Sequence, residues 1–529
     1  MTPRLLAECP ARGPLRGRLG RHEVAATPGA APSAARSIAP REWLGWRRDR
    51  RSIRHDSSCD RGGDSMNKVG LPPGAWRKPQ TGLLTLTAAA LITGAGAGVA
   101  GAAFRASLEA ADRWRNIMIA SAHASALTGF LLVVGACAAA TLISAGLVRR
   151  FSPEASGSGI PHVEAVLRDG IPPASYLLPP VKFVGGDLAI GAGLALGPEG
   201  PAVQLGASIA VLIGRAFRLS WPDLRAILAA GAGAGLATAF NAPLAGGAFV
   251  LEELLQSFDR RIAIAALAAS ATAIAVTRAV LGDTLIFHVP SLPNVAAEAR
   301  PFFFLLGAVM GLVAVAYNRT VLATLAAFER LPLPVEARAG LIGAAVGVLA
   351  WVSPGLVGGG DPITQDALRG GPALQLVALA FLVRFGLVAV SNAAGAPGGL
   401  FAPLLALGAQ FGLMFGSACH WAIPWLDVPS ESFALVGMAA LLAGVVRAPL
   451  TGLVLVSEMT GNVTLLLPML GACAMAMLVP TLLCDPPIYD SLREALLRRG
   501  RVAGLAKLAI KADADDASLV SPAGRESRS

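Results

Sequence analysis

The chain has 529 residues, of which 54% are hydrophobic and 15% are charged, and its formal net charge is +10. A soluble domain usually carries about 45–50% apolar and about 25% charged residues. This composition therefore excludes a disordered chain, a coiled coil and an ordinary cytosolic enzyme. Residues 1–80 contain 16 Lys and Arg against 7 Asp and Glu, so nearly all of the net positive charge belongs to the N-terminal segment.

The N-terminal segment, residues 1–78, is rich in Arg, Pro, Ala and Gly. Such a basic segment can be an arm that binds nucleic acid or lipid. We favour a solvated, disordered leader and expect no nucleic-acid partner. Translation starting at Met66, just before the apolar part of the chain, is a further alternative.

The rest of the chain contains long runs without Asp, Glu, Lys or Arg. These runs are residues 79–104, 116–148, 226–251, 339–360, 385–425 and 459–484. A helix that crosses a bilayer needs about 20 such residues. We therefore predict an all-α polytopic membrane protein whose membrane domain spans residues 79–500, followed by a short polar cytoplasmic tail at 501–529.

Basic residues flank both ends of this domain, at Arg77 and Lys78 before it and at Arg498 and Arg499 after it. The positive-inside rule then places both termini in the cytoplasm. We expect a multi-pass membrane protein in contact with the lipid bilayer.

The membrane domain contains an internal repeat. Asn-Ala-Pro-Leu-Ala-Gly at 241–246 leads to Glu252, and Arg-Ala-Pro-Leu-Thr-Gly at 447–452 leads to Glu458, an offset of 206 residues. Pro201 and Pro403 begin a second matching pair at an offset of 202. These matches predict two homologous halves, at about 79–283 and 300–500, and many transporters place their substrate site between such halves.

Gly and Pro interrupt the apolar runs at four places. The interruptions are residues 157–161, 197–201, 395–403 and 486–487. Irregular backbone at membrane depth is tolerated only where it is buried in protein or lines a wet cavity. Broken helices also direct free N–H groups and a positive dipole end inward, which favours anions. These breaks therefore predict an anion pathway.

Several residues near the breaks can carry chemistry. Glu199 places a carboxylate at a predicted helix N-terminus inside an apolar stretch, where an ionisable residue is by default a functional candidate. Its ionised carboxylate would compete with a free anion for this position, and its protonated form could leave it. The alternative to this functional role is that Glu199 only caps the helix. Glu252 and Glu253 follow directly after another apolar run. One of them could carry a proton, or both could simply anchor the helix end at the membrane interface.

Hydrogen-bond donors for an anion come from the other breaks. Ser158 offers a hydroxyl between two glycines that allow close approach of the backbone, although the motif alone also fits a helix cap. The amides of Leu400 and Phe401 can face an anion. Tyr489 can add a phenolic donor or be an aromatic residue of the membrane interface.

Other patterns do not support an enzyme, a cofactor or a metal site. The six cysteines include no C-x-x-C pair. The G-x-G-x-x-G at 96–101 lies in an apolar run, where close helix packing is the better interpretation. His162-x-Glu164 lacks the P-C-x-x-C that a deaminase zinc site requires.

Taken together, the motifs resemble those of the CLC family of chloride channels and chloride/proton antiporters. The resemblance covers residues 82–499 and rests on Gly-Ser-Gly-Ile-Pro at 157–161, G-x-E-G-P at 197–201, the Asn-Ala-Pro-Leu-Ala-Gly element, G-x-F-x-P at 399–403 and Tyr489. It implies an inverted repeat of two homologous halves with many tilted and broken helices. It also implies a homodimer with one anion pathway in each subunit.

The resemblance assigns roles to residues of this chain. Ser158 and Tyr489 match the central hydroxyl ligands, Leu400 and Phe401 match the amide donors, and Gly159 and Gly200 complete the implied chloride site. Glu199 matches the external gating glutamate and Glu253 the internal proton glutamate of antiporters. Ser158 goes with chloride in this family, with other small anions permeant. Proton-coupled chloride exchange is thus implied, and no cofactor is expected.

Two positions depart from the family pattern. Pro198 stands where Arg or Lys is common, and His162 stands where an acidic residue is frequent. We expect no nucleotide-binding regulatory modules after the membrane domain. In this the chain resembles the simple prokaryotic members of the CLC family, which implies the bacterial inner membrane. Two alternatives to exchange stay open: a passive, voltage- or pH-gated chloride channel without proton coupling, and a membrane sensor or scaffold that does not transport.

Overall fold

The computed structural model describes residues 82–499, except 291, 293, 294, 372 and 373. The predicted basic leader at 1–78 and the predicted polar tail at 501–529 lie outside these described residues. Within them the chain is helical, and strand pairing is limited to two isolated bridges, Gly157 with Pro397 and Gly197 with Gly399.

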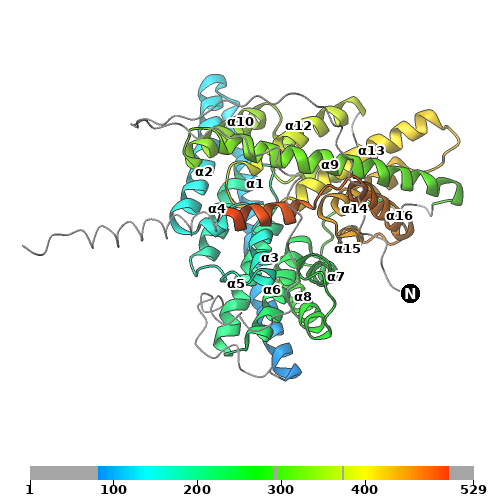
Figure 1. Cartoon of the computed structure of the whole chain (residues 1–529). Helices are drawn as coiled ribbons and strands as arrows, with labels where there is room; N and C mark the ends of the chain where they lie inside the picture. Colours follow the sequence, from blue (N-terminus) through cyan, green and yellow to red (C-terminus); the bar gives the residue numbers. More distant parts are fainter. Residues whose placement is uncertain (1–81, 291, 293–294, 372–373, 500–529) are drawn as a thin grey trace, which may run out of the picture. The chain divides into compact units, whose positions relative to one another are not determined.

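The helices fall into two successive sets (Figure 1). The first set is α1 (Leu83–Ala122), α2 (Ala126–Phe151), α3 (Ile160–Arg168), α4 (Leu178–Gly191), α5 (Glu199–Ala216), α6 (Trp221–Phe240), α7 (Pro243–Phe249) and α8 (Arg260–Leu281). The second set is α9 (Arg300–Glu329), α10 (Val335–Val352), α11 (Asp361–Ala367), α12 (Leu374–Asn392), α13 (Phe401–Ala422), α14 (Ser430–Val446), α15 (Pro449–Thr460) and α16 (Leu466–Leu482). Residues 488–499 are also helical.

The two sets repeat one packing plan, which confirms the predicted fold class. α1 packs on α8 as α9 packs on α16, α5 on α6 as α13 on α14, and α6 on α8 as α14 on α16. Short 3-10 turns precede α3 at Pro153–Ala155 and α11 at Pro354–Leu356. In both cases a glycine with positive φ, Gly159 or Gly360, then starts the helix.

Small residues bring the helices of each half close together. A Cβ on Gly231 of α6 would lie 2.5 Å from the Gly206 carbonyl oxygen of α5. In the second half, a Cβ on Gly437 of α14 would lie 2.4 Å from the Gly408 carbonyl oxygen of α13. Membrane helices pack through such small residues because backbones can then approach closely.

The charge-free run 226–251 forms two helices rather than one membrane span. α6 ends at Asn241, whose φ of 49° lies in the left-handed region that Asn tolerates, and α7 begins two residues later. The equivalent end of α14 is Arg447, with a φ of 73°. The repeated Ala-Pro-Leu motif therefore marks the start of a short helix in both halves.

Two glutamates join the halves reciprocally. The Glu252 carboxylate accepts hydrogen bonds from the backbone N–H groups of Leu450 and Thr451, at 3.0 and 2.7 Å, at the N-terminus of α15. The Glu458 carboxylate accepts from Leu244 and Ala245, at 3.1 and 2.8 Å, at the N-terminus of α7. Each half thus caps a helix of the other, as a two-fold relationship between inverted repeats requires.

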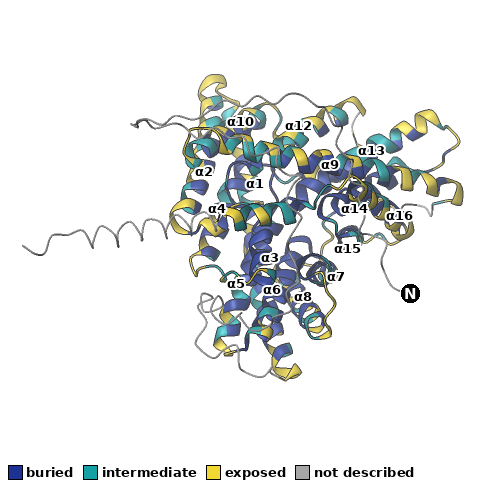
Figure 2. Cartoon of the chain, in the orientation of Figure 1, coloured by how far each residue is buried: buried dark blue, intermediate teal, exposed yellow. Residues whose placement is uncertain are grey.

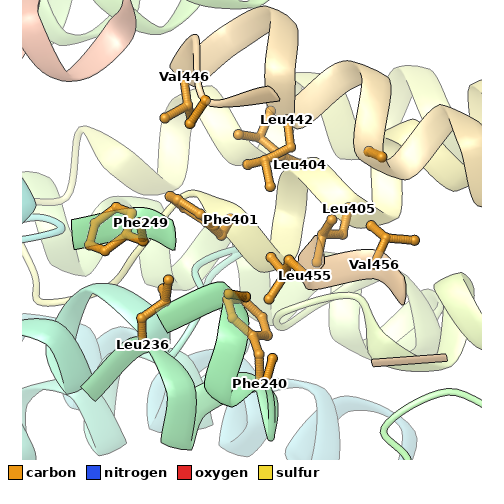
Figure 3. Packing of buried hydrophobic residues seen from close by; sticks show 14 of the residues in the cluster. Leu236, Phe240, Phe249, Phe401, Leu404, Leu405, Leu442, Val446, Leu455 and Val456 are labelled. Atoms are coloured by element: carbon orange, nitrogen blue, oxygen red, sulfur yellow. The ribbon is translucent and has the colours of Figure 1, made fainter. Parts of the chain in front are cut away.

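The core lies along α6 and α14, whose residues are almost all buried (Figure 2). Phe401 of the second half packs with Phe240 and Phe249 of the first half, with ring centroids 6.2 and 6.0 Å apart (Figure 3). These contacts join the halves where α13 begins.

Seven helices of the described residues are long and apolar enough to cross a membrane. They are α1, α2, α8, α9 with the turn before it, α10, α12 and α13. Large apolar side chains are exposed on their outer faces, for example Leu131 and Leu142 of α2. Apolar surface of this kind suits a lipid environment.

Candidate functional site

Three of the predicted chain breaks meet in space. Gly197 and Gly399 exchange backbone hydrogen bonds of 2.9 and 2.7 Å. Gly157 donates to the Ala396 carbonyl at 3.1 Å and accepts from the Gly398 N–H at 3.1 Å. These pairs bring the N-termini of α3, α5 and α13 together, so the site is built from irregular backbone buried in protein.

Glu199 is the first residue of α5, and its side chain is completely buried. Its Oε1 accepts a hydrogen bond of 2.6 Å from the Phe401 N–H, at the first residue of α13. Its Oε2 has no hydrogen-bonding partner among the described residues. The carboxylate therefore occupies the N-terminus of α13, which is a position that favours an anion.

The glycines that form the backbone bridge leave room for this carboxylate. A Cβ on Gly197 would lie 2.0 Å from Glu199 Oε2, and a Cβ on Gly399 would lie 2.1 Å from Oε1. Both distances are far below van der Waals contact. Any larger residue at either position would displace the Glu199 side chain.

Two hydroxyl groups lie beside this carboxylate site. Ser158 is buried between Gly157 and Gly159, both with positive φ, and Tyr489 is completely buried. The Ser158 and Tyr489 hydroxyls lie close to each other, and neither has a further hydrogen-bonding partner among the residues that the structure describes. A buried hydroxyl without a partner is costly unless something accepts its proton. Both groups are free to donate to an anion.

Contacts connect these hydroxyls to the α13 N-terminus. The Tyr489 ring stacks on the Phe401 ring, with centroids 6.1 Å apart. A Cβ on Gly200 would lie 2.8 Å from Ser158 Oγ, so Gly200 permits the approach of Ser158 to α5. Leu400 is buried as the N-cap residue of α13. The structure thus brings together all the residues predicted for the anion site.

Gly159 has a separate structural role. Its φ of 82° favours glycine, and a Cβ there would lie 2.2 Å from Gln204 Oε1 and 3.0 Å from Lys182 Nζ. Gly159 therefore allows Gln204 and Lys182 to pack against the Ser158 loop.

The sequence analysis did not identify Lys182, a completely buried cation of α4. Its Nζ donates to the carbonyl oxygens of Ala155 and Gly157, at 3.0 and 2.7 Å. It thereby holds the loop that presents Ser158. A lone lysine in an apolar stretch is the same signal that identified Glu199.

Glu253 lies at the other end of α3. It belongs to the π-helical turn Val250–Leu254 and is 4% exposed. Arg168, the last residue of α3, donates to the Glu253 carbonyl and, at 2.8 Å, to the Leu254 carbonyl. α3 has nine residues and is therefore about 14 Å long. The Glu253 backbone thus lies at the C-terminal end of α3, whereas Ser158 lies just before its N-terminal end.

A second buried carboxylate, Glu164 of α3, neighbours Glu253. Arg493 lies 3.9 Å from Glu164, 3.1 Å from Asp490 and 3.6 Å from Asp169. These groups form a charged network between Glu253 and the helix at 488–499. The sequence analysis considered Glu164 only as part of a zinc signature and did not predict a role for it. A carboxylate between apolar residues could have identified it as a candidate functional residue.

Glu252 and Glu253 are adjacent in sequence but have different surroundings. The Glu252 carboxylate is engaged at the N-terminus of α15, whereas the Glu253 carboxyl group faces Glu164. Within residues 82–499, apart from the five undescribed positions, no group of three or more His, Cys, Asp or Glu side chains is placed to hold a metal ion.

Comparison with known proteins shows the family to which the chain belongs. Residues 140–481 match the family model described as voltage gated chloride channel. The chain is 37% identical over 424 residues to the H(+)/Cl(-) exchange transporter ClcA of Vibrio parahaemolyticus, covering 78% of this chain and 90% of that protein. It is 36% identical over 422 residues to the ClcA of Yersinia pseudotuberculosis, covering 78% of this chain and 88% of that protein.

A solved structure has the same fold. The X-ray structure of a slow cyanobacterial Cl-/H+ antiporter superposes with a TM-score of 0.75 at 33% identity, covering 78% of this chain and 98% of that chain. The helices that carry Glu199 and Glu253 thus belong to a fold that this chain shares with the cyanobacterial antiporter.

Proposed function

Because the chain belongs to the voltage-gated chloride channel family, we propose that it exchanges chloride for protons across a membrane, with Glu199 as the gate. The observation that carries this proposal is the 2.6 Å hydrogen bond from the Phe401 N–H to the Glu199 carboxylate. A tethered carboxylate and a free chloride would compete for the same helix N-terminus. Protonation of Glu199 removes its charge and releases this position to chloride.

The chloride site next to the gate is formed by donors from three elements. Ser158 and Tyr489 supply hydroxyl groups that have no other partner among the described residues, and Phe401 supplies an amide. Leu400 adds a second amide at the start of α13, while Gly159 and Gly200 let the backbone approach. Lys182 supports this site by holding the Ser158 loop through the carbonyl oxygens of Ala155 and Gly157. The same donors suit other small anions.

Glu253 is the proton carrier on the side opposite the gate. It is buried, it neighbours Glu164, and its turn is held by Arg168. Two adjacent buried carboxyl groups cannot both ionise cheaply, so the pair retains a proton that either group can pass on. The Arg493 network connects this pair with Asp490 and Asp169, which are partly exposed.

The remaining assignments concern the membrane location, the orientation and the oligomeric state of the protein. The protein is a multi-span integral membrane protein of a family of transport proteins. We place it in the bacterial inner membrane because its ClcA relatives are bacterial. Both termini are assigned to the cytoplasm, as the basic flanks of the membrane domain favour. We also assign it a homodimeric state, as the resemblance to the CLC family implies. Each chain would hold one complete anion pathway, since all the residues of the proposed site come from one copy.

The test uses the purified full-length protein in liposomes with a chloride gradient and a pH electrode. Chloride flowing down its gradient should move protons in the opposite direction against their own gradient. Chloride flux without proton movement would instead establish the passive channel. If neither ion moved in protein that is folded and correctly inserted, the sensor or scaffold would replace both transport functions.

A further inference from the structure

A cavity of about 120 Å³ approaches the gate from the side of Pro198. It reaches Pro198 and Ala402, which are the chain neighbours of Glu199 and Phe401. Glu199 itself is completely buried and does not line the cavity. A proton that enters the cavity therefore still has to cross from its wall to the buried carboxyl group.

The charged lining of this cavity is mainly acidic. Glu109 and Asp112 of α1 and Asp361 of α11 contribute three carboxylates, and Arg105 contributes one guanidinium. When all four are ionised, the lining carries a net charge of −2. Such a potential concentrates protons and repels chloride. Pro198 adds no charge to offset it.

Asp361 is the member of this lining that connects with the gate. Its side chain is exposed to the cavity. It lines the same cavity as Pro198, and the loop before it packs against the segment before Glu199, where a Cβ on Gly359 would lie 3.7 Å from the Leu196 carbonyl oxygen. The other charged groups that face Asp361 are Arg105, Glu109 and Asp112 of α1 and Arg384 of α12.

The backbone before Asp361 is held in place by a completely buried arginine. Arg384 donates to the carbonyl oxygens of Leu356, Gly358 and Gly359, at 3.1, 2.8 and 2.8 Å. The Gly358 N–H also donates to the Gly193 carbonyl at 2.8 Å, which ties this loop to the segment before α5. Asp361 is thus presented to the gate from a rigid loop.

We propose that Asp361 is a proton relay between this cavity and Glu199. Asp361 takes a proton from water in the cavity. Asp361 then gives its proton to a bridging water as that water gives a proton to Glu199, so the O–H bond at Asp361 breaks and an O–H bond forms at Glu199, whose Oε2 has no partner among the described residues. Asp361 is left ionised, and neutral Glu199 leaves the α13 N-terminus. The reverse sequence returns a proton to the cavity.

This inference rests on the proposed exchange function, and the test keeps the two apart. Proton and chloride fluxes are measured together in liposomes for the full-length Asp361→Asn variant. We expect exchange at neutral pH to slow by about tenfold, less than the loss of a general acid usually costs, because water offers a slower route. The difference should shrink as the pH on the cavity side falls, and Asp361→Glu should restore the rate.

The matched control is Glu109→Gln, which removes the same charge from the same cavity. Its exchange rate should stay within about twofold of the unchanged protein, since Glu109 is largely exposed and pairs at 3.9 Å with Arg113. An equal effect of Glu109→Gln and Asp361→Asn would replace the relay with a general effect of cavity charge.

A double variant separates a relay from a structural role. In Glu199→Ala there is no gate to protonate, so adding Asp361→Asn should leave the chloride flux unchanged. A similar loss of chloride flux with and without Glu199 would overturn the relay, as would full exchange in Asp361→Asn alone. Failure of the unchanged protein to move protons would instead reject the exchange function.

Discussion

Glu199 and Phe401 are equivalent positions in the two halves, 202 residues apart, and they are joined by a hydrogen bond of 2.6 Å. The bridge between Gly197 and Gly399 has the same offset. The proposed gate therefore lies where the two repeats meet. One half supplies the carboxylate and the other supplies the helix N-terminus that binds it.

The first prediction concerns this pair. Glu199→Ala removes the tethered carboxylate, so chloride flux should persist while coupled proton movement is lost. In the unchanged protein, protonation frees the anion site, so chloride flux should rise as the pH falls. In Glu199→Ala the flux should not depend on pH. Flux assays across a pH series test this, and proton uptake retained in the variant would remove Glu199 from the gating role.

The second prediction separates two adjacent glutamates. Glu253→Gln should stop proton movement and spare chloride flux, because the amide cannot release a proton. Glu252→Gln should preserve coupling, because Glu252 acts as a helix cap. Paired proton and chloride measurements on both variants provide the comparison. Normal proton movement in Glu253→Gln would show that another carboxyl group carries the proton, and Glu164 would be the first to test.

The third prediction concerns the hydroxyl ligands. A hydrogen bond to a charged group contributes about 1.5–3 kcal/mol. Tyr489→Phe and Ser158→Ala should therefore each weaken chloride binding by about tenfold or more. Titration calorimetry on the detergent-solubilised protein measures this. Tyr176→Phe is the control, since Tyr176 is exposed and pairs with Arg215. Unchanged affinity in both site variants would exclude these hydroxyls as ligands.

The fourth prediction concerns the reciprocal caps. Glu252→Ala and Glu458→Ala each leave two backbone N–H groups of the opposite half without their carboxylate. Each variant should lose roughly 1.5–3 kcal/mol of stability. Thermal unfolding in detergent measures the loss, and Glu298→Ala at an exposed position is the control. A large loss in only one of the two variants would contradict their equivalence.

Much of this protein follows from local sequence patterns. Long charge-free runs predict membrane helices because a bilayer leaves no partner for unpaired backbone groups. The offsets of 206 and 202 residues predict two halves, and the Gly and Pro breaks predict helix ends inside the membrane domain. Ser158, Glu199, Phe401 and Tyr489 could all be found in this way, since each lies in or beside a break.

Only the tertiary structure decides which of these residues meet. No local pattern places Glu253 beside Glu164, Lys182 under the Ser158 loop, or Asp361 near Glu199. These neighbours lie on different helices, and their proximity depends on how the helices of the two halves cross. The sequence by itself determined the chemistry available to the site. The packing of two inverted repeats decided its geometry, because that packing brings helix N-termini from both halves to one point.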